Sequence, residues 1–223
     1  MINSPTLITG IERSGSSLVA RIINICGGFS GNTTGMLENK AIGIFVDKYY
    51  RFFGADIRGQ FPLPDIENLY IPQEWQENIT ELFKKEGHTG QPVFYKSARI
   101  GQVWPIWSFA FPTAKWIIVR RRTGDIIQSC MKTAYMNAFE KEQTCKQVGA
   151  DTPAKGWLWW VHEHEKRLMQ LIQSGVQHRI IWPDRMVDGD YTQIQEMVEW
   201  LGLEWNNKVF KEIDPLIQKE RKR

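Results

Sequence analysis

The segment Gly10–Leu18, with the sequence GIERSGSSL, combines residue types that bind phosphate groups. Its two glycines let the backbone turn tightly and approach an oxyanion, and Arg13 adds a cation with a planar set of donors. If a helix begins within the segment, its first amides and its dipole also favour an anion. The alternative is a glycine-containing turn with a serine N-cap. We expect phosphate contacts from six residues: Arg13, Ser14, Gly15, Ser16, Ser17 and Leu18.

The spacing of this segment is similar to the pattern GxxxxGK[ST], with Gly10 and Gly15 as its two glycines. Ser16 stands where that pattern has lysine. A kinase or nucleoside triphosphatase without this lysine loses a contact to the β- and γ-phosphates. The segment therefore favours an enzyme that holds a nucleotide by its 5′-phosphate end, and a P-loop nucleotide or small-molecule kinase stays open as an alternative.

A second group of basic residues, Arg120–Arg122, directly follows the apolar run Trp116–Val119. Such a run is typical of a strand buried on both faces of a parallel sheet. The strand candidate Thr6–Thr9 likewise ends directly before Gly10. Because ligands of α/β sheets bind at the carboxyl ends of the strands, we expect these two segments to lie at the same edge.

The order of the other elements predicts how these segments are positioned. Strand candidates alternate with segments of helical periodicity, which indicates a parallel sheet covered by helices on both faces. We therefore predict an α/β fold, a three-layer sandwich with a central parallel sheet, similar to P-loop nucleoside triphosphatases. The predicted strands are Thr6–Thr9, Val93–Tyr95, Trp116–Val119 and Arg179–Trp182. The predicted helices include Ser16–Cys26, Ala41–Phe53, Asp125–Ala134, Trp157–Ile172 and a last one that ends at Gly202.

Length and composition set the wider limits. No linker or repeat interrupts the 223 residues, so we predict one domain over 1–223. A net charge of +3 is too small to indicate nucleic acid or a membrane surface as the main partner. Neither a signal peptide nor a run of 18 apolar residues is found, so no membrane span is expected. Cys26, Cys130 and Cys145 form no CxxC pair and indicate reduced, mostly buried thiols of a cytoplasmic protein. His162 and His164 face different directions on a helix, so we expect no metal site.

The sequence FPTAKWIIVRRRTGDIIQS, together with GIERSGSSL, resembles the sulfotransferases that use 3′-phosphoadenosine 5′-phosphosulfate (PAPS). The first loop of that family reads roughly PRSGTT or PKSGTT. Its second motif is FPxAKFIxxxR, followed at intervals of four by an aspartate and a serine. The arginine that ends this motif, the aspartate and the serine correspond to Arg121, Asp125 and Ser129. The segments IIWPDRMVDGDY and EMVEWLGL are similar to later family segments. The resemblance covers about Thr6 to Leu203, except for 54–92, where no motif is recognised.

The resemblance implies that Arg121 and Ser129 bind the 3′-phosphate of PAPS, the group that distinguishes PAPS from ATP. It also implies transfer of the sulfuryl group to a hydroxyl or amine, with release of 3′-phosphoadenosine 5′-phosphate (PAP) and without a metal ion. Among the departures from the family pattern, two lie in these motifs. Thr123 and Gly124 replace the usual proline and its neighbour, and Arg13 stands where the cytosolic branch has lysine.

The same resemblance implies which residues act in the reaction. Arg13 would stabilise the charge that develops on the leaving phosphate. Family members take the proton of the acceptor with a histidine or with a glutamate shortly after the first helix, and Glu38 occupies the second place. The alternative is that Glu38 only helps to start the next helix. Lys96 and Arg99 would bind the sulfate or the acceptor, and their alternative is surface charge.

The polar segment 135–155 follows the helix that carries Ser129, and its composition predicts a lid-like insertion over the acceptor. The acceptor itself is not indicated by the sequence. A small molecule, a saccharide, a lipid and a peptide all stay open. A second alternative to the enzyme is a non-catalytic module that binds phosphate or sulfate esters.

Overall fold

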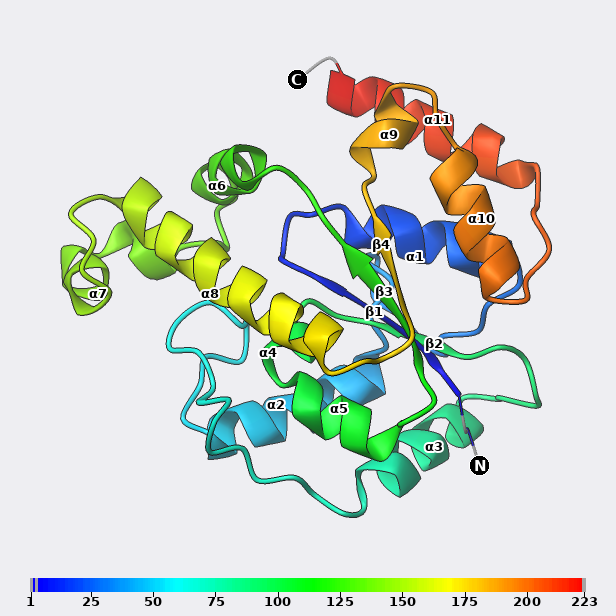
Figure 1. The fold of residues 1–223 in the computed structure, drawn as a ribbon, viewed down its shortest axis with the longest axis horizontal. Coiled ribbons are helices and arrows are strands. Elements are labelled where there is room, and N and C mark those ends of the chain that lie inside the picture. The colour runs from blue at the N-terminus through cyan, green and yellow to red at the C-terminus, as the bar shows by residue number, and fades with distance from the viewer. Residues whose placement is uncertain (1, 3, 222–223) are drawn as a thin grey trace.

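The computed structural model describes residue 2 and residues 4–221, with side chains described as far as residue 214. Four strands of the described residues lie at the centre, and helices surround them (Figure 1). The strands are β1 (Thr6–Gly10), β2 (Phe94–Lys96), β3 (Lys115–Val119) and β4 (His178–Ile181). The helices of the first half are α1 (Ser16–Ile25), α2 (Lys40–Phe52), α3 (Trp75–Lys85), α4 (Arg99–Gln102) and α5 (Trp104–Ala110). Those of the second half are α6 (Thr123–Lys132), the 3₁₀ helix η1 (Ala138–Glu140), α7 (Glu142–Gln147), α8 (Pro153–Gln173), α9 (Asp184–Val187), α10 (Thr192–Trp200) and α11 (Lys208–Arg221).

The described strands form one parallel sheet in the order β2-β1-β3-β4. The chain leaves β1 toward β2 on one side, and it leaves β3 toward β4 on the other side. The connections therefore diverge between β1 and β3, and in open parallel sheets ligands bind at such a point. The register pairs Gly10 with Val119, so the segments that follow these two residues start side by side.

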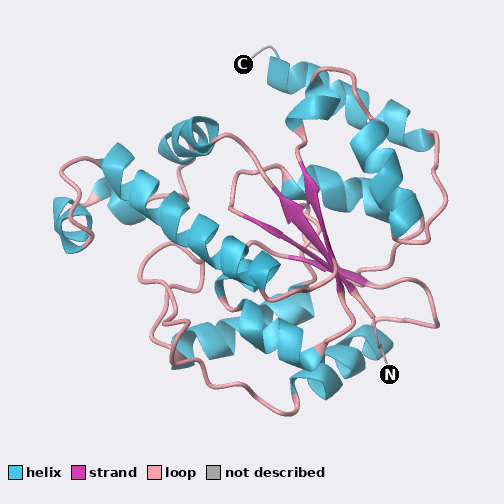
Figure 2. Ribbon diagram, viewed as in Figure 1, coloured by secondary structure: helices cyan, strands magenta, loops and turns pink. Residues whose placement is uncertain are grey.

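Alternating side chains of the strands build two cores, one on each face of the sheet. Leu7, Trp116 and Ile118 pack with α2, α3, α5 and α8. Ile8 and Ile117 point to the opposite face and pack with α1, α10 and α11. Figure 2 shows the three layers, with the strands between two groups of helices. The prediction of a three-layer α/β sandwich with a central parallel sheet is thus confirmed.

Several bounds of the predicted elements were wrong. The fourth strand covers His178–Ile181, and only Ile181 is buried, because β4 lies at one edge of the described sheet and its residues line an open groove. The helix after β3 begins at Thr123, before the predicted start, and ends at Lys132. The single domain over 1–223 stays a prediction, and it includes residues 1, 3, 222 and 223, which lie outside the described residues.

The segment 135–155, predicted to be a lid, contains η1, α7 and the first turn of α8. It is anchored by buried side chains, among them Met136 and Phe139. Gly156 permits this packing, because a Cβ atom there would lie 2.5 Å from the Phe139 ring. A lid function of this segment stays a prediction.

Candidate functional site

The loop between β1 and α1 has a backbone that only certain residues permit. A Cβ atom on Gly10 would lie 2.4 Å from the carbonyl oxygen of Val119 and 2.8 Å from Ser14 Oγ. Gly15 has a φ of 93° and Arg13 a φ of 71°, both in the left-handed region that favours glycine. The loop is therefore a tight turn that lies against the carboxyl end of β3.

The first amides of α1 have no side-chain hydrogen-bond partner in the described part of the chain. Gly15 is the N-cap residue, and no side chain caps the first amides of this helix. The serine N-cap considered for this loop is therefore wrong. Uncapped amides and the helix dipole together favour an anion at this end. Ser14 adds a buried hydroxyl that has no hydrogen-bond partner among the described residues.

Three of the predicted cofactor-binding residues lie in contact at this edge of the sheet. The Arg13 Nε atom donates a hydrogen bond to Ser129 Oγ at 2.9 Å, and these residues are 116 positions apart. The Arg121 Nη1 atom donates to the carbonyl oxygen of Arg13 at 3.1 Å. Because β1 and β3 are neighbours, the loop after β1 faces the end of β3 and the helix α6. The structure thus assembles two guanidinium groups and a hydroxyl in one place.

Four buried side-chain atoms at this edge have no hydrogen-bond partner among the described residues. They are Glu12 Oε2, Ser14 Oγ, Arg120 Nε and Arg121 Nε. An unsatisfied buried polar atom costs about 1–3 kcal/mol, so most such atoms are bonded in folded proteins. Three of these four groups are donors that a phosphate oxygen satisfies. The residues present therefore fit a phosphate-bearing ligand.

The predicted base Glu38 lies beside the predicted contact residue Lys96. Lys96 Nζ donates to Glu38 Oε1 at 2.9 Å, and the side chains of Lys96 and Glu38 are 6% and 33% exposed. Lys96 is the last residue of β2 and pairs with Ile8 in the neighbouring strand. Glu38 does not cap the following helix, because Asn39 Oδ1 accepts the bond from Ile42 N.

Arg99, predicted to bind sulfate or acceptor, is held by groups of its own chain. Its Nη1 atom forms an ion pair with Asp47 of α2 and donates to the carbonyl oxygen of Ile57 at 2.7 Å. Its guanidinium lies 5.4 Å from the centre of the Tyr50 ring. Arg99 therefore joins α4 to α2, and its contact with a substrate stays a prediction.

The cap of α2 holds the segment that carries Glu38, so its loss should destabilise the protein. Asn39 Nδ2 donates to the carbonyl oxygen of Ser30 at 2.9 Å and to Glu86, in addition to the cap bond. We expect Asn39→Ala to lower the free energy of unfolding by about 1–3 kcal/mol in urea denaturation. Asn68→Ala, which removes an exposed amide, is the control with little change. Equal midpoints for the two variants would contradict this role of Asn39.

Two features of the site were missed by the sequence analysis. Glu12 lies inside the loop predicted to bind phosphate, and a carboxylate next to a predicted anion site was a signal that we did not use. The segment after β4 packs on the same loop, since a Cβ atom on Gly15 would lie 3.1 Å from Pro183. The neighbouring Trp182 is 38% exposed, and Arg120 lies 5.9 Å from the centre of its ring. An exposed aromatic face beside basic residues suits a planar base.

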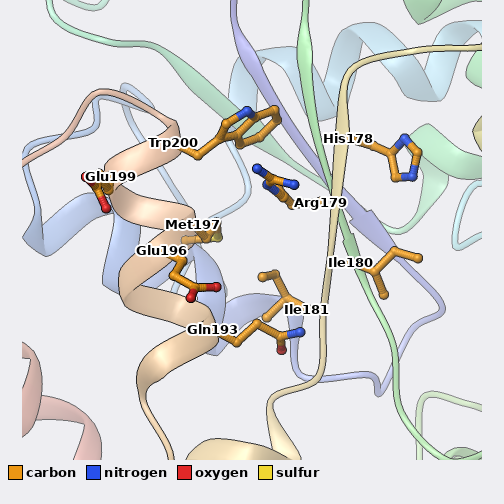
Figure 3. Close-up of a pocket in the computed structure, with 9 residues that line it drawn as sticks. All are labelled: His178, Arg179, Ile180, Ile181, Gln193, Glu196, Met197, Glu199 and Trp200. Carbon is orange, nitrogen blue, oxygen red and sulfur yellow. The ribbon is translucent and has the colours of Figure 1, made fainter.

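A separate groove of about 710 Å³ lies between β4 and α10 (Figure 3). Arg179 points toward Trp200 in this groove, 5.3 Å from the ring centre, and Glu196 and Glu199 project from α10. The groove follows the outer side of β4, whereas the uncapped helix end and the unsatisfied donors lie at the carboxyl ends of β1 and β3. We therefore place the candidate site at those strand ends.

The described residues hold neither a cluster of metal-ligating side chains nor a membrane-spanning helix. They contain no group of three or more His, Cys, Asp or Glu side chains placed to hold a metal ion. They also contain no helix that is long and apolar enough to cross a membrane.

The sheet order and the arrangement of helices define this chain as a protein with the sulfotransferase fold. Sulfotransferase STF9 from Mycobacterium avium matches 98% of this chain and 69% of its own, with a TM-score of 0.60 and 11% identity. The sulfotransferase domain of the Synechococcus PCC 7002 olefin synthase matches 93% of this chain and 76% of its own, with a TM-score of 0.57 and 16% identity. A sulfotransferase from Alicyclobacillus acidocaldarius matches 98% of this chain and 93% of its own, with a TM-score of 0.56 and 16% identity. No protein-family model and no curated protein matched the sequence. The similarity therefore lies in the fold, which agrees with the resemblance read from the motifs.

Proposed function

We propose that this chain is a PAPS-dependent sulfotransferase that transfers a sulfuryl group to a hydroxyl or amine and releases PAP. The observation that carries the proposal is the contact of Arg13, Arg121 and Ser129 beside the uncapped helix α1. The acceptor would be a small molecule, a saccharide, a lipid or a peptide. The fold of the similar structures, which are named as sulfotransferases, supports this class of reaction.

Several residues of the site have a proposed task. Arg121 and Ser129 bind the 3′-phosphate, and Ser14 with the first amides of α1 binds the 5′-phosphate end. Arg13 stabilises negative charge there as the reaction proceeds, which is the largest catalytic contribution in many enzymes. Lys96 orients the acceptor, and Glu38 is the base that the sequence suggests. When bound, PAPS supplies the sulfuryl group.

The kinase alternative is less well supported by the same geometry. Ser16 stands at the lysine position of the P-loop and is itself buried in the start of α1. Arg121 and Ser129 flank the loop, so the site offers donors for a second phosphate group, which PAP has at its 3′ position. A kinase would instead need contacts to β- and γ-phosphates.

The choice of nucleotide tests the proposed function directly. We expect PAP to raise the melting temperature more than ADP at equal concentration, because only PAP has the 3′-phosphate. By linkage, a ligand at about 100 times its dissociation constant stabilises the folded state by about 2.7 kcal/mol. Differential scanning fluorimetry measures both shifts.

Two controls separate the competing functions. EDTA should leave the PAP shift unchanged. A shift that needs Mg²⁺, or equal shifts with PAP and ADP, would favour the kinase. Release of PAP from PAPS with a panel of phenols, alcohols and amines distinguishes the enzyme from a module that only binds.

A further inference from the structure

Glu12 is the charged residue of the first loop that has no task in the proposed function. It directly precedes Arg13, and its Oε2 atom is buried without a hydrogen-bond partner among the described residues. Burial raises the pKa of Glu12 to about 7, and the negative charge of Glu38 also raises it. A buried carboxylate without a partner is costly, so its presence in a ligand-binding loop calls for an explanation.

Charged and titratable groups of several elements interact electrostatically with Glu12. Glu38 opposes its ionisation, whereas three cations favour it without outweighing the effect of burial. The charge of Glu12 in turn affects groups of α2, α6 and the segment after α6. The cations are Lys96 of β2, Arg99 of α4 and Arg13 of the loop, and the affected groups are Tyr50, Cys130 and Tyr135.

The carboxylates of Glu12 and Glu38 differ in the interactions that a bound proton would disrupt. Glu38 is bonded to Lys96, whose side chain is only 6% exposed. A proton on Glu38 would leave this buried ammonium without its counter-charge, which is strongly unfavourable. A proton on Glu12 Oε2 breaks no hydrogen bond, because that atom accepts none from the described residues. A proton therefore binds more easily to Glu12 than to Glu38.

We propose, resting on the proposed function, that Glu12 is the catalytic residue that takes the acceptor's proton, and that the Glu38–Lys96 pair positions the acceptor. The O–H or N–H bond of the acceptor breaks and its proton moves to Glu12. The acceptor atom forms a bond to sulfur, the bond from sulfur to the phosphate oxygen breaks, and that electron pair leaves with PAP. The sequence analysis instead predicts that Glu38 takes this proton, so the two assignments lead to different experimental results.

The pKa of Glu12 and its place next to Arg13 both suit a general base that works at neutral pH. A general base is most effective when its pKa lies near the working pH, because it is then both ionised and basic. Glu12 also adjoins Arg13, which contacts Ser129, so the proton acceptor and the group that stabilises the leaving phosphate are neighbours in the chain.

The test compares Glu12→Gln and Glu38→Gln, with Glu81→Gln as a surface control that loses only an exposed pair with Lys84. The rate of PAP release from PAPS is measured between pH 5 and 9 with a phenol, an aliphatic alcohol, an amine and water as acceptors. PAP binding is measured on the same samples by thermal shift. Glu12→Asp, which keeps the carboxylate on a shorter side chain, serves as a second variant should Glu12→Gln fold poorly.

We expect wild-type turnover to rise with pH around a midpoint near 7, and Glu12→Gln to lose this rise together with about 10²–10⁴-fold of turnover. PAP affinity should stay within a few-fold. The turnover of Glu38→Gln should still rise with pH, but with its midpoint at a lower pH, because the negative charge that raises the pKa of Glu12 is removed. Wild-type turnover in Glu12→Gln, or loss of the rise in Glu38→Gln only, would overturn the proposal. A wild-type chain that neither binds PAP nor releases it from PAPS would instead reject the proposed function, and this proposal with it.

Stability gives a readout that needs no substrate. The folded-state pKa of Glu12 lies above its unfolded value, so the folded protein binds more protons between about pH 4.5 and 7. Wild-type stability therefore falls relative to Glu12→Gln as the pH rises from about 4.5 to 7, and the melting temperature of the variant should exceed that of wild type at pH 8. A constant difference between pH 5 and 8 would show that Glu12 does not titrate in this range, and would overturn the proposal.

Discussion

Replacing Arg121 by alanine should weaken PAP binding by about 10- to 150-fold. Arg121 lies just after β3, and its Nε atom is buried without a partner among the described residues. A hydrogen bond to a charged group contributes roughly 1.5–3 kcal/mol, and each 1.4 kcal/mol corresponds to about a factor of ten in affinity. Calorimetric titration of PAP into wild type and variant measures the loss.

Two comparisons separate a phosphate contact from a structural role of Arg121. AMP lacks the 3′-phosphate, so its affinity should change far less than that of PAP. Arg122→Ala removes the neighbouring guanidinium, which is exposed, and should leave PAP binding nearly unchanged. If Arg121→Ala weakened AMP and PAP by the same factor, the residue would hold the loop through its bond to the Arg13 carbonyl oxygen and would not recognise the 3′-phosphate.

The fold could be predicted from local sequence patterns, because the central strands have unambiguous hydrophobic patterns. The run Trp116–Val119 is apolar on both faces of its strand, and all four residues are buried in β3. The pattern of β4 was less informative, since an apolar run does not reveal that its strand is the outermost. His178 and Arg179 are not fully buried there, because they line the groove between β4 and α10.

The candidate site was predictable in part. Arg13 and Ser129 were selected separately, from motif positions, and their contact follows from the adjacency of β1 and β3. The surroundings of Arg99 were not predictable, because its partner Asp47 lies 52 positions away on another helix and no spacing rule connects them. The pKa of about 7 at Glu12 depends on its burial and on the charges of Glu38, Lys96 and Arg99, which are distant in the sequence, so no local pattern indicates it.

Arg13→Gly should keep the protein folded and remove most of its activity. Arg13 is a non-glycine residue with a φ of 71°, a conformation that costs an L-amino acid roughly 1–2 kcal/mol. Glycine relieves this cost, which offsets the loss of the bond to Ser129 Oγ and the greater freedom of the unfolded chain. We therefore expect the free energy of unfolding to stay within about 1 kcal/mol of wild type.

Activity should fall much further than stability in this variant. Loss of one donor that stabilises developing negative charge typically lowers turnover by about 10²–10³-fold. Arg13→Lys keeps the charge but not the planar set of donors, so its turnover should lie between those of wild type and Arg13→Gly. PAP release from PAPS measures turnover, and urea denaturation measures stability. A strained residue is retained at a functional site because its side chain is needed there. Near wild-type turnover in Arg13→Gly would refute this role and leave the φ of Arg13 without a functional reason.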